Sequence, residues 1–61
     1  MYEIYNNLEE KTIFKGNERE FIVFVEKIVI ENEDFSYSVL GVSDAIEYIE
    51  VYCADLKLIE G

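Results

Sequence analysis

Residues 17–31 have the sequence NEREFIVFVEKIVIE, and two opposite structures compete for it. Its apolar runs are rich in Phe, Ile and Val, which favour strands, so a hairpin turning at residues 26–27 has to be considered. That turn contains no Gly, Asn or Asp, which tight hairpins need for positive φ. Asn17, in contrast, is a good helix N-cap, and Glu20 three residues later completes a capping-box pattern. A helix is therefore the better interpretation.

The apolar residues of this segment also share one side of a helix. At about 100° per residue they occupy an arc of about 160°, a width that suits a helix lying on a sheet. Glu18 would lie in the first turn, where the helix dipole favours negative charge. The pattern predicts a helix over residues 18–31, with these residues facing the core: Phe21, Ile22, Phe24, Val25, Ile28 and Val29.

The residues before this helix predict a β-hairpin. Residues 2–5 and 12–15 are short runs rich in β-branched and aromatic side chains, which favour strands. The polar segment 6–11 separates them, and Gly16 ends the second run. We therefore expect two antiparallel strands joined by a short polar connection.

The residues after the helix predict a third strand. Residues 31–34 are polar and predict a turn. Residues 35–39, FSYSV, alternate large apolar with small polar side chains, which is the period of a half-buried strand. Gly41 closes this run. We expect the strand to join the hairpin.

A second helix is predicted from residue 44 to about residue 55. Ser43 is a natural N-cap, and Asp44 complements the helix dipole. Residues 56–59, LKLI, leave two alternatives open, an extra helical turn or a last edge strand. The apolar residues that recur at helical spacing are Ala45, Ile46, Ile49, Tyr52, Cys53 and Leu56.

These elements predict an α+β fold with the order β-β-α-β-α. A right-handed connection from the second strand through the first helix places both helices on one face of a small three-stranded sheet. The length of 61 residues leaves room for a single domain, residues 1–61. The expected architecture is therefore a two-layer domain.

The composition indicates a folded domain that needs support. Hydrophobic residues make up 51% of the chain, unlike chains that remain unfolded. A domain of this size buries only about 60% of the surface that its unfolded chain exposes. The single cysteine, Cys53, cannot form an intrachain disulfide, so a homo-oligomer, most simply a homodimer, is expected to add stability.

The same features predict a cytoplasmic protein. The N-terminus lacks a secretory signal pattern, and the longest apolar run, residues 21–25, is far shorter than the ~20 residues that span a bilayer. A lone thiol fits a reducing compartment. The chain from Met1 to Gly61 shows no linker or repeat, which is expected of a complete short gene product.

The residue types argue against an enzyme. There is no His, and His is the usual base that activates a hydroxyl or thiol nucleophile. Cys53 is better interpreted as a small core residue. Glu47 and Glu50 lie one turn apart, but on a polar helix face that would not shift their pKa values apart. Residues 31–34 supply oxygen ligands without the pattern of a calcium loop. No catalytic residue, cofactor or metal is predicted.

The net charge of −9 points to a protein partner. Lys and Arg supply the affinity for a phosphate backbone, so direct nucleic-acid binding is disfavoured. Asp44, Glu47 and Glu50 form an acidic row along the second helix, with neighbours about 5–6 Å apart. Such a row could meet a basic protein, or it could imitate phosphates and occupy the groove of a nucleic-acid enzyme. A merely solubilising surface is the third interpretation.

Apolar residues predict a possible self-association surface. Val23 and Ile30 lie seven residues apart on the side of the first helix opposite the core, and Val51 and Leu58 do the same if the second helix extends that far. Scattered exposed apolar residues are also common without any role. The open face of the sheet is an equal candidate, lined by some of Tyr2, Tyr5, Phe14 and Tyr37.

Two segments carry a resemblance to a known type of protein. Residues 14–17, FKGN, lead into an acidic amphipathic helix, and residues 45–50, AIEYIE, precede Tyr52. In size, composition and element order the chain resembles the short early-region proteins of phages of low-GC Gram-positive bacteria, particularly the lactococcal ones. The resemblance implies a non-catalytic effector, located in the host cytoplasm, that binds and redirects a host enzyme. It assigns no role to individual residues.

The sequence therefore predicts a small acidic protein-interaction module, with a phage-encoded effector of a host protein as its most specific form. One alternative is a DNA mimic that inhibits a nucleic-acid-binding enzyme. The other is a structural homodimer or assembly subunit.

Overall fold

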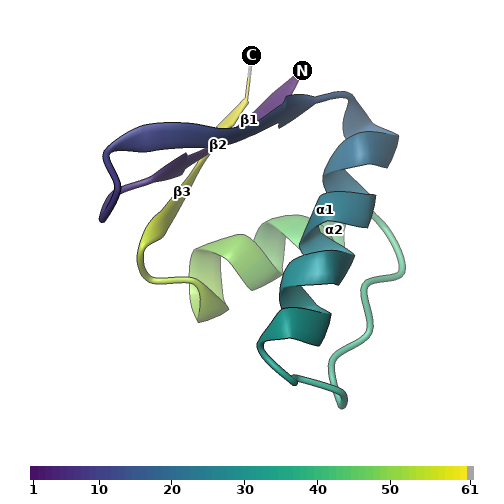
Figure 1. The fold of residues 1–61 in the computed structure, drawn as a ribbon. Helices are drawn as coiled ribbons and strands as arrows, with labels where there is room; N and C mark the ends of the chain where they lie inside the picture. The colour runs from purple at the N-terminus through teal and green to yellow at the C-terminus, as the bar shows by residue number, and fades with distance from the viewer. Residues whose placement is uncertain (61) are drawn as a thin grey trace.

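Three antiparallel strands and two helical segments make up the computed structural model, which describes residues 1–60. Strands β1 (Tyr2–Asn6), β2 (Lys11–Gly16) and β3 (Leu56–Glu60) form one sheet in the order β2-β1-β3. Helix α1 (Glu18–Glu31) and the pair α2 (Val42–Glu47) and η1 (Tyr48–Tyr52) cover one face of this sheet (Figure 1). The predicted α+β class, with a three-stranded sheet and two helices in two layers, is confirmed.

The N-terminal hairpin forms as predicted, with small adjustments at its turn. The Asn6 side-chain oxygen accepts hydrogen bonds from the main-chain N–H groups of Leu8 and Glu9, at 2.8 and 3.0 Å. Glu10 adopts a φ of 54°, and the pairing register shifts between Ile4 and Tyr5. An Asx-type turn therefore reverses the chain direction here, as an Asn-Gly or Asp-Gly pair does in tighter hairpins.

Helix α1 has the predicted bounds, residues 18–31. Asn17 Oδ1 accepts from the Glu20 N–H at 2.9 Å, and Glu20 Oε1 accepts from the Asn17 N–H at 2.9 Å, so the capping box is complete. The helix buries Phe21, Val25 and Val29 against the sheet and α2. The capping box and the burial of one helix face thus outweigh the preference of these residues for a strand.

The prediction of a strand at residues 35–39 is wrong. This segment leaves α1 through a turn at Glu33, where φ is 58°, and runs without a strand partner to α2. The third strand is β3, from the tail that the sequence pattern left undecided. Leu58 pairs with Ile4 in the centre of the sheet, so β3 offers Leu56 and Leu58 to the core. Residues 35–39 are instead held at α2, where the Tyr37 hydroxyl donates to the Asp44 carbonyl oxygen at 2.9 Å.

The second helix differs from its prediction at both ends. Its N-cap is Gly41, without a side-chain hydrogen bond, so the prediction that Ser43 caps it is wrong. The Asp44 carboxylate instead accepts from the Leu40 N–H at 2.9 Å and closes the start of the helix. The last turns are π-helical and end at Tyr52, because Cys53 leaves the helical region with φ −116° and ψ 80°.

The core lies between the sheet and the helices. Its residues come from β1, α1 and the α2–η1 helix, namely Ile4, Phe21, Val25, Val29, Ala45, Tyr48 and Ile49. Tyr2 and Phe14 face this core and not the open side of the sheet, since Tyr2 stacks on Phe21 with ring centroids 4.8 Å apart and Phe14 packs against Phe24 at 4.8 Å. Tyr37 lies outside the sheet.

Tyr48 is the largest fully buried side chain. Its hydroxyl donates to the Asp34 carboxylate and accepts from Asn32 Nδ2 at 3.1 Å. Its ring contacts Tyr37 and Tyr52, with centroids 5.0 and 5.3 Å away. Tyr48 therefore connects the C-terminal end of α1, the following turn and η1.

We predict that Tyr48→Phe lowers the free energy of unfolding by about 1 kcal/mol, because it removes a hydroxyl that both donates and accepts a hydrogen bond. In a domain of this size the midpoint should fall by roughly 4–8 °C, which thermal unfolding followed by circular dichroism measures. Tyr52→Phe is the matched control, since Tyr52 is 56% exposed, and its effect should stay within about 0.5 kcal/mol. Equal effects of the two changes would refute the role given to the Tyr48 hydroxyl.

Candidate functional site

The charged residues divide unevenly between two parts of the sequence. Residues 28–56 contain seven acidic residues and no Lys or Arg, whereas the rest of the chain contains the other seven acids and all five cations. This segment forms the end of α1, the connection to α2, and the α2–η1 helix. We call its carboxylates the acidic face: Glu31, Glu33, Asp34, Asp44, Glu47, Glu50 and Asp55.

The predicted acidic row is only partly available to a partner. Glu47 and Glu50 are exposed, as expected. Asp44 is half-buried, and its carboxylate is already held by the Leu40 N–H at 2.9 Å. Because η1 winds more widely than an α-helix, Glu50 also does not continue the α-helical spacing of Asp44 and Glu47.

Other carboxylates of the acidic face remain exposed although Asp44 is engaged within the fold. Glu31, Glu33 and Asp55 are exposed, whereas Asp34 is half-buried and accepts from the Tyr48 hydroxyl. Among residues 1–60 the one ion pair joins Lys11 to Glu9 at 3.7 Å, in the β1–β2 connection. The acidic face therefore carries uncompensated negative charge.

A tyrosine cluster lies beside this face, and sequence analysis missed it. Tyr37, Tyr48 and Tyr52 contact one another with ring centroids 5.0–5.4 Å apart. Burial raises the pKa of the Tyr37 hydroxyl, and the charges of Glu47 and Asp44 raise it further. Burial and the hydrogen bond to Asp34 raise the pKa of Tyr48. The four-residue spacing of Tyr48 and Tyr52 was a visible signal of their contact, but nothing local predicted that Tyr37 joins them.

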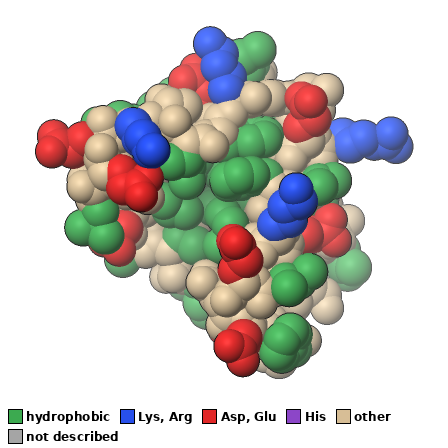
Figure 2. Space-filling model, in the orientation of Figure 1, with side chains coloured by type: hydrophobic (Ala, Val, Ile, Leu, Met, Phe, Trp, Pro, Cys, Tyr) green, Lys and Arg blue, Asp and Glu red, His purple; other side chains and the backbone are tan. Residues whose placement is uncertain are grey.

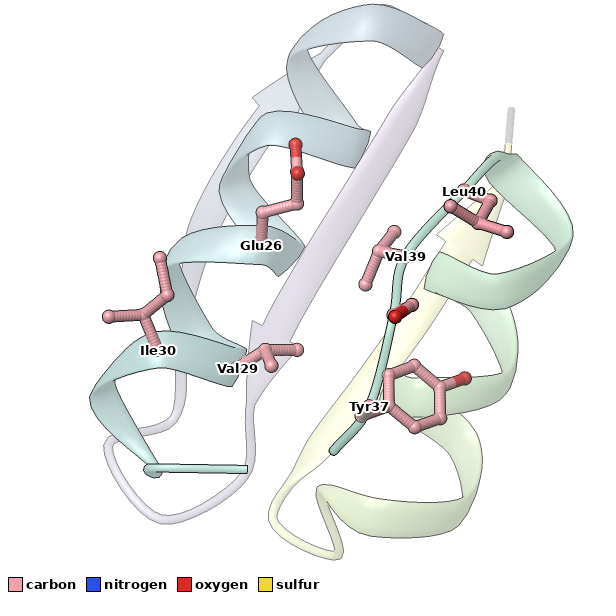
Figure 3. A pocket seen from close by; sticks show the side chains of 7 residues that line it. Glu26, Val29, Ile30, Tyr37, Val39 and Leu40 are labelled. Carbon is pink, nitrogen blue, oxygen red and sulfur yellow. The ribbon is translucent and has the colours of Figure 1, made fainter. Parts of the chain in front are cut away.

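A groove of about 290 Å³ separates α1 from the extended segment before α2. Its walls are Glu26, Val29 and Ile30 on α1 and residues 37–40 on the other side (Figure 3). Ile30 and Leu40 are 63% and 87% exposed. This groove adds an apolar surface to the acidic face.

Three of the four predicted interface residues are exposed, and the fourth packs against the core. Val23, Ile30 and Val51 are exposed, at 48%, 63% and 65%, which fits their expected positions away from the core. Leu58 is not on a helix, because it lies in β3 opposite Ile4 and packs against the core. The expected stripe of Val51 with Leu58 therefore does not exist.

A second apolar hollow opens between β2 and α1. It has a volume of about 520 Å³, and its apolar lining includes Ile13, Phe24, Ile28 and Leu56. Figure 2 shows hydrophobic side chains across the middle of this side, with Lys, Arg, Asp and Glu side chains around them. Glu31 and Asp55 of the acidic face are part of the lining of this hollow, which contains no Lys or Arg.

Cys53 is the one thiol, and its surroundings do not activate it. The side chain is half-buried, and its pKa is raised by burial first and by the Asp34 charge second. A reactive cysteine needs the opposite environment, in which positive charge lowers the pKa. In the described part of the chain no group of His, Cys, Asp and Glu side chains is arranged to hold a metal ion.

We predict that Cys53 reacts slowly with Ellman's reagent near neutral pH. Since the folded protein disfavours the thiolate, the reaction at about pH 8 should be roughly ten-fold slower than for the same protein in concentrated urea. Absorbance at 412 nm follows the reaction. A folded-state rate equal to the rate in urea would mean that the thiol is neither shielded nor held protonated.

Comparison with known proteins does not indicate a function, so the proposal below depends on the site described above. No protein-family model, curated protein or solved structure matches the chain. Among residues 1–60 no helix combines the length and apolar character needed to cross a membrane.

Proposed function

We propose that this protein is a non-catalytic interaction module that binds a basic protein through its acidic face. The observation that carries the proposal is the division of charge, with seven carboxylates and no cation over residues 28–56. An even scatter of charge would serve solubility equally well. A segment that carries acidic residues and no cation also favours approach to a partner of opposite sign.

The expected consequence is fast, salt-sensitive association. Complementary fields can raise association rates by ~10-fold or more, and ionic strength near 0.15 M screens exposed charges beyond about 8 Å. Glu47 and Glu50 are the most useful residues for this role, because both are exposed on one helix. The protonated, half-buried Cys53 and the lack of His in the sequence support a binding role over a catalytic one.

We predict that the double variant Glu47→Lys/Glu50→Lys loses its partner. Immobilised wild-type protein should retain a basic protein from a lactococcal lysate at low salt and release it at about 300 mM NaCl. The variant should retain at least ten-fold less, as judged by quantitative mass spectrometry. Glu9→Lys/Glu10→Lys is the matched control, because it changes the net charge equally but lies in the β1–β2 connection.

Two results would contradict the proposal. Retention of no protein at low salt would remove its basis, and an equal loss in both variants would show that only net charge matters. Circular dichroism of each variant separates lost binding from lost folding.

A DNA mimic remains the alternative, and the exposure of both Glu47 and Glu50 is what favours it. If the captured partner binds DNA, duplex DNA should displace it from the immobilised protein in proportion to DNA concentration. A complex that DNA does not disturb would favour the general interaction module. A tight homodimer in sedimentation, with no captured ligand, would instead favour the structural role.

We predict that the thermal midpoint rises with added salt. The seven carboxylates of the acidic face have no cation in their own segment, so their mutual repulsion destabilises the compact state and salt relieves it. Differential scanning calorimetry from about 20 to about 300 mM NaCl checks this. A flat or falling midpoint would indicate that the acidic groups are locally compensated.

A further inference from the structure

Residues 37–40 run past α1 as an extended connection that has no strand beside it (Figure 3). They are held at both ends. The Tyr37 N–H donates to the Asp34 carbonyl oxygen at 3.0 Å, and its hydroxyl donates to the Asp44 carbonyl oxygen at 2.9 Å. The Leu40 N–H donates to the Asp44 carboxylate. Between these anchors, the main-chain groups of Ser38 and Val39 form no hydrogen bond within residues 1–60.

This arrangement leaves main-chain donors and acceptors fixed and available. An unpaired extended segment is a template for another strand, and many proteins recognise partners by adding the partner's extended chain to such a segment. The sequence FSYSV of residues 35–39 has the alternation of a strand. The strand prediction failed because residues 35 and 36 form a turn and the segment does not join the sheet, but residues 37–40 follow as an extended connection (Figure 3).

The groove beside this segment supplies places for side chains. Val29 is 6% exposed and points from α1 toward residues 37–40, and Ile30 and Leu40 belong to the two opposite sides of the groove (Figure 3). Apolar side chains of an added strand would cover Ile30 and Leu40, which are otherwise among the most exposed large hydrophobic residues of the chain. Four residues of strand span about 13 Å, so the pairing would be short and would rely on these contacts.

Charge determines which strand fits. Glu26 lies on the α1 wall, and Asp44 and Glu47 lie on the far side of Tyr37, close enough to influence its hydroxyl. The nearest cation in sequence, Lys27, lines a different hollow with Phe14 and Val23. A second copy of this chain would bring another charge of −9 to an acidic site. A basic strand is attracted there.

We infer that the groove binds an extended basic segment of the partner protein, which pairs with residues 37–40 as an added β-strand. Its apolar side chains contact Ile30 and Leu40, and its Lys or Arg side chains lie near Glu26. This inference rests on the proposed function, in which the partner is a basic protein, and it adds the mode of recognition.

The test uses three synthetic hexapeptides with blocked ends. The first alternates Lys and Val, the second alternates Glu and Val, and the third is the Lys-Val peptide with N-methyl groups on every second residue. NMR of the labelled protein should show that the Lys-Val peptide shifts the amides of Ser38 and Val39 and slows their exchange. The Glu-Val and N-methylated peptides should bind at least ten-fold more weakly.

Proline variants show whether the main chain takes part. Ser38→Pro removes one N–H from the centre of the segment and should weaken Lys-Val binding at least ten-fold. Phe35→Pro, at the second position of the turn that the Tyr37 N–H closes, where proline is favoured, is the control and should leave binding within two-fold. Circular dichroism and the thermal midpoint confirm that both variants are folded.

Several outcomes would overturn the inference. These are no Lys-Val binding at millimolar concentration, binding that N-methylation does not change, shifts confined to another surface, or protection of Ser38 and Val39 that appears with protein concentration alone, which would identify a second copy. If Ser38→Pro still captures the lysate partner while Glu47→Lys/Glu50→Lys does not, the inference fails and the proposed function stands.

Discussion

The hydroxyl of Tyr48 is the interaction on which the arrangement of the helical layer depends. It is held by Asp34 and Asn32 at the end of α1, and its ring fills the core under η1. Removing water from a polar group is costly unless the group is hydrogen-bonded. Tyr48 can therefore be buried only where the turn after α1 meets it, and this requirement places α1 and the α2–η1 helix relative to each other.

This arrangement also determines where the acidic groups lie. Tyr37 reaches the same cluster from the extended segment, so that segment is held next to α2 and not next to the sheet. The packing of Tyr37 against Tyr48 therefore determines both the groove beside α1 and the positions of Glu47 and Glu50. Asp34 and Asp44 stabilise this packing directly, because each accepts a hydrogen bond within the fold.

Local signals in the sequence were sufficient for some elements. The hairpin and α1 were predictable because their turn residues and the capping box of Asn17 and Glu20 act over a few residues. The third strand was not, because residues 35–39 and β3 both alternate and the choice depends on distant partners such as Ile4. Ser43 failed as a cap for a similar reason, since Asp44 reaches back to Leu40.

For the candidate site, too, local sequence signals were sufficient for some features but not for those that depend on distant contacts. The excess of acidic residues and the exposure of Glu47 and Glu50 follow from composition and helical spacing. The engagement of Asp44, the placement of Leu58 in a strand and the contact of Tyr37 with Tyr48 depend on tertiary packing. Sequence patterns therefore predicted the sign of the surface but not the groove within it.

The separation of cations from the acidic face has a rotational consequence. The α2–η1 helix carries acidic residues and no cation, whereas the cations belong to β2, α1 and β3, so we expect the molecule to have a permanent dipole moment. A torque acts on such a dipole in the field of any charged body, so the protein turns before it touches. Each approach to a positively charged surface would then begin with the same end of the molecule leading.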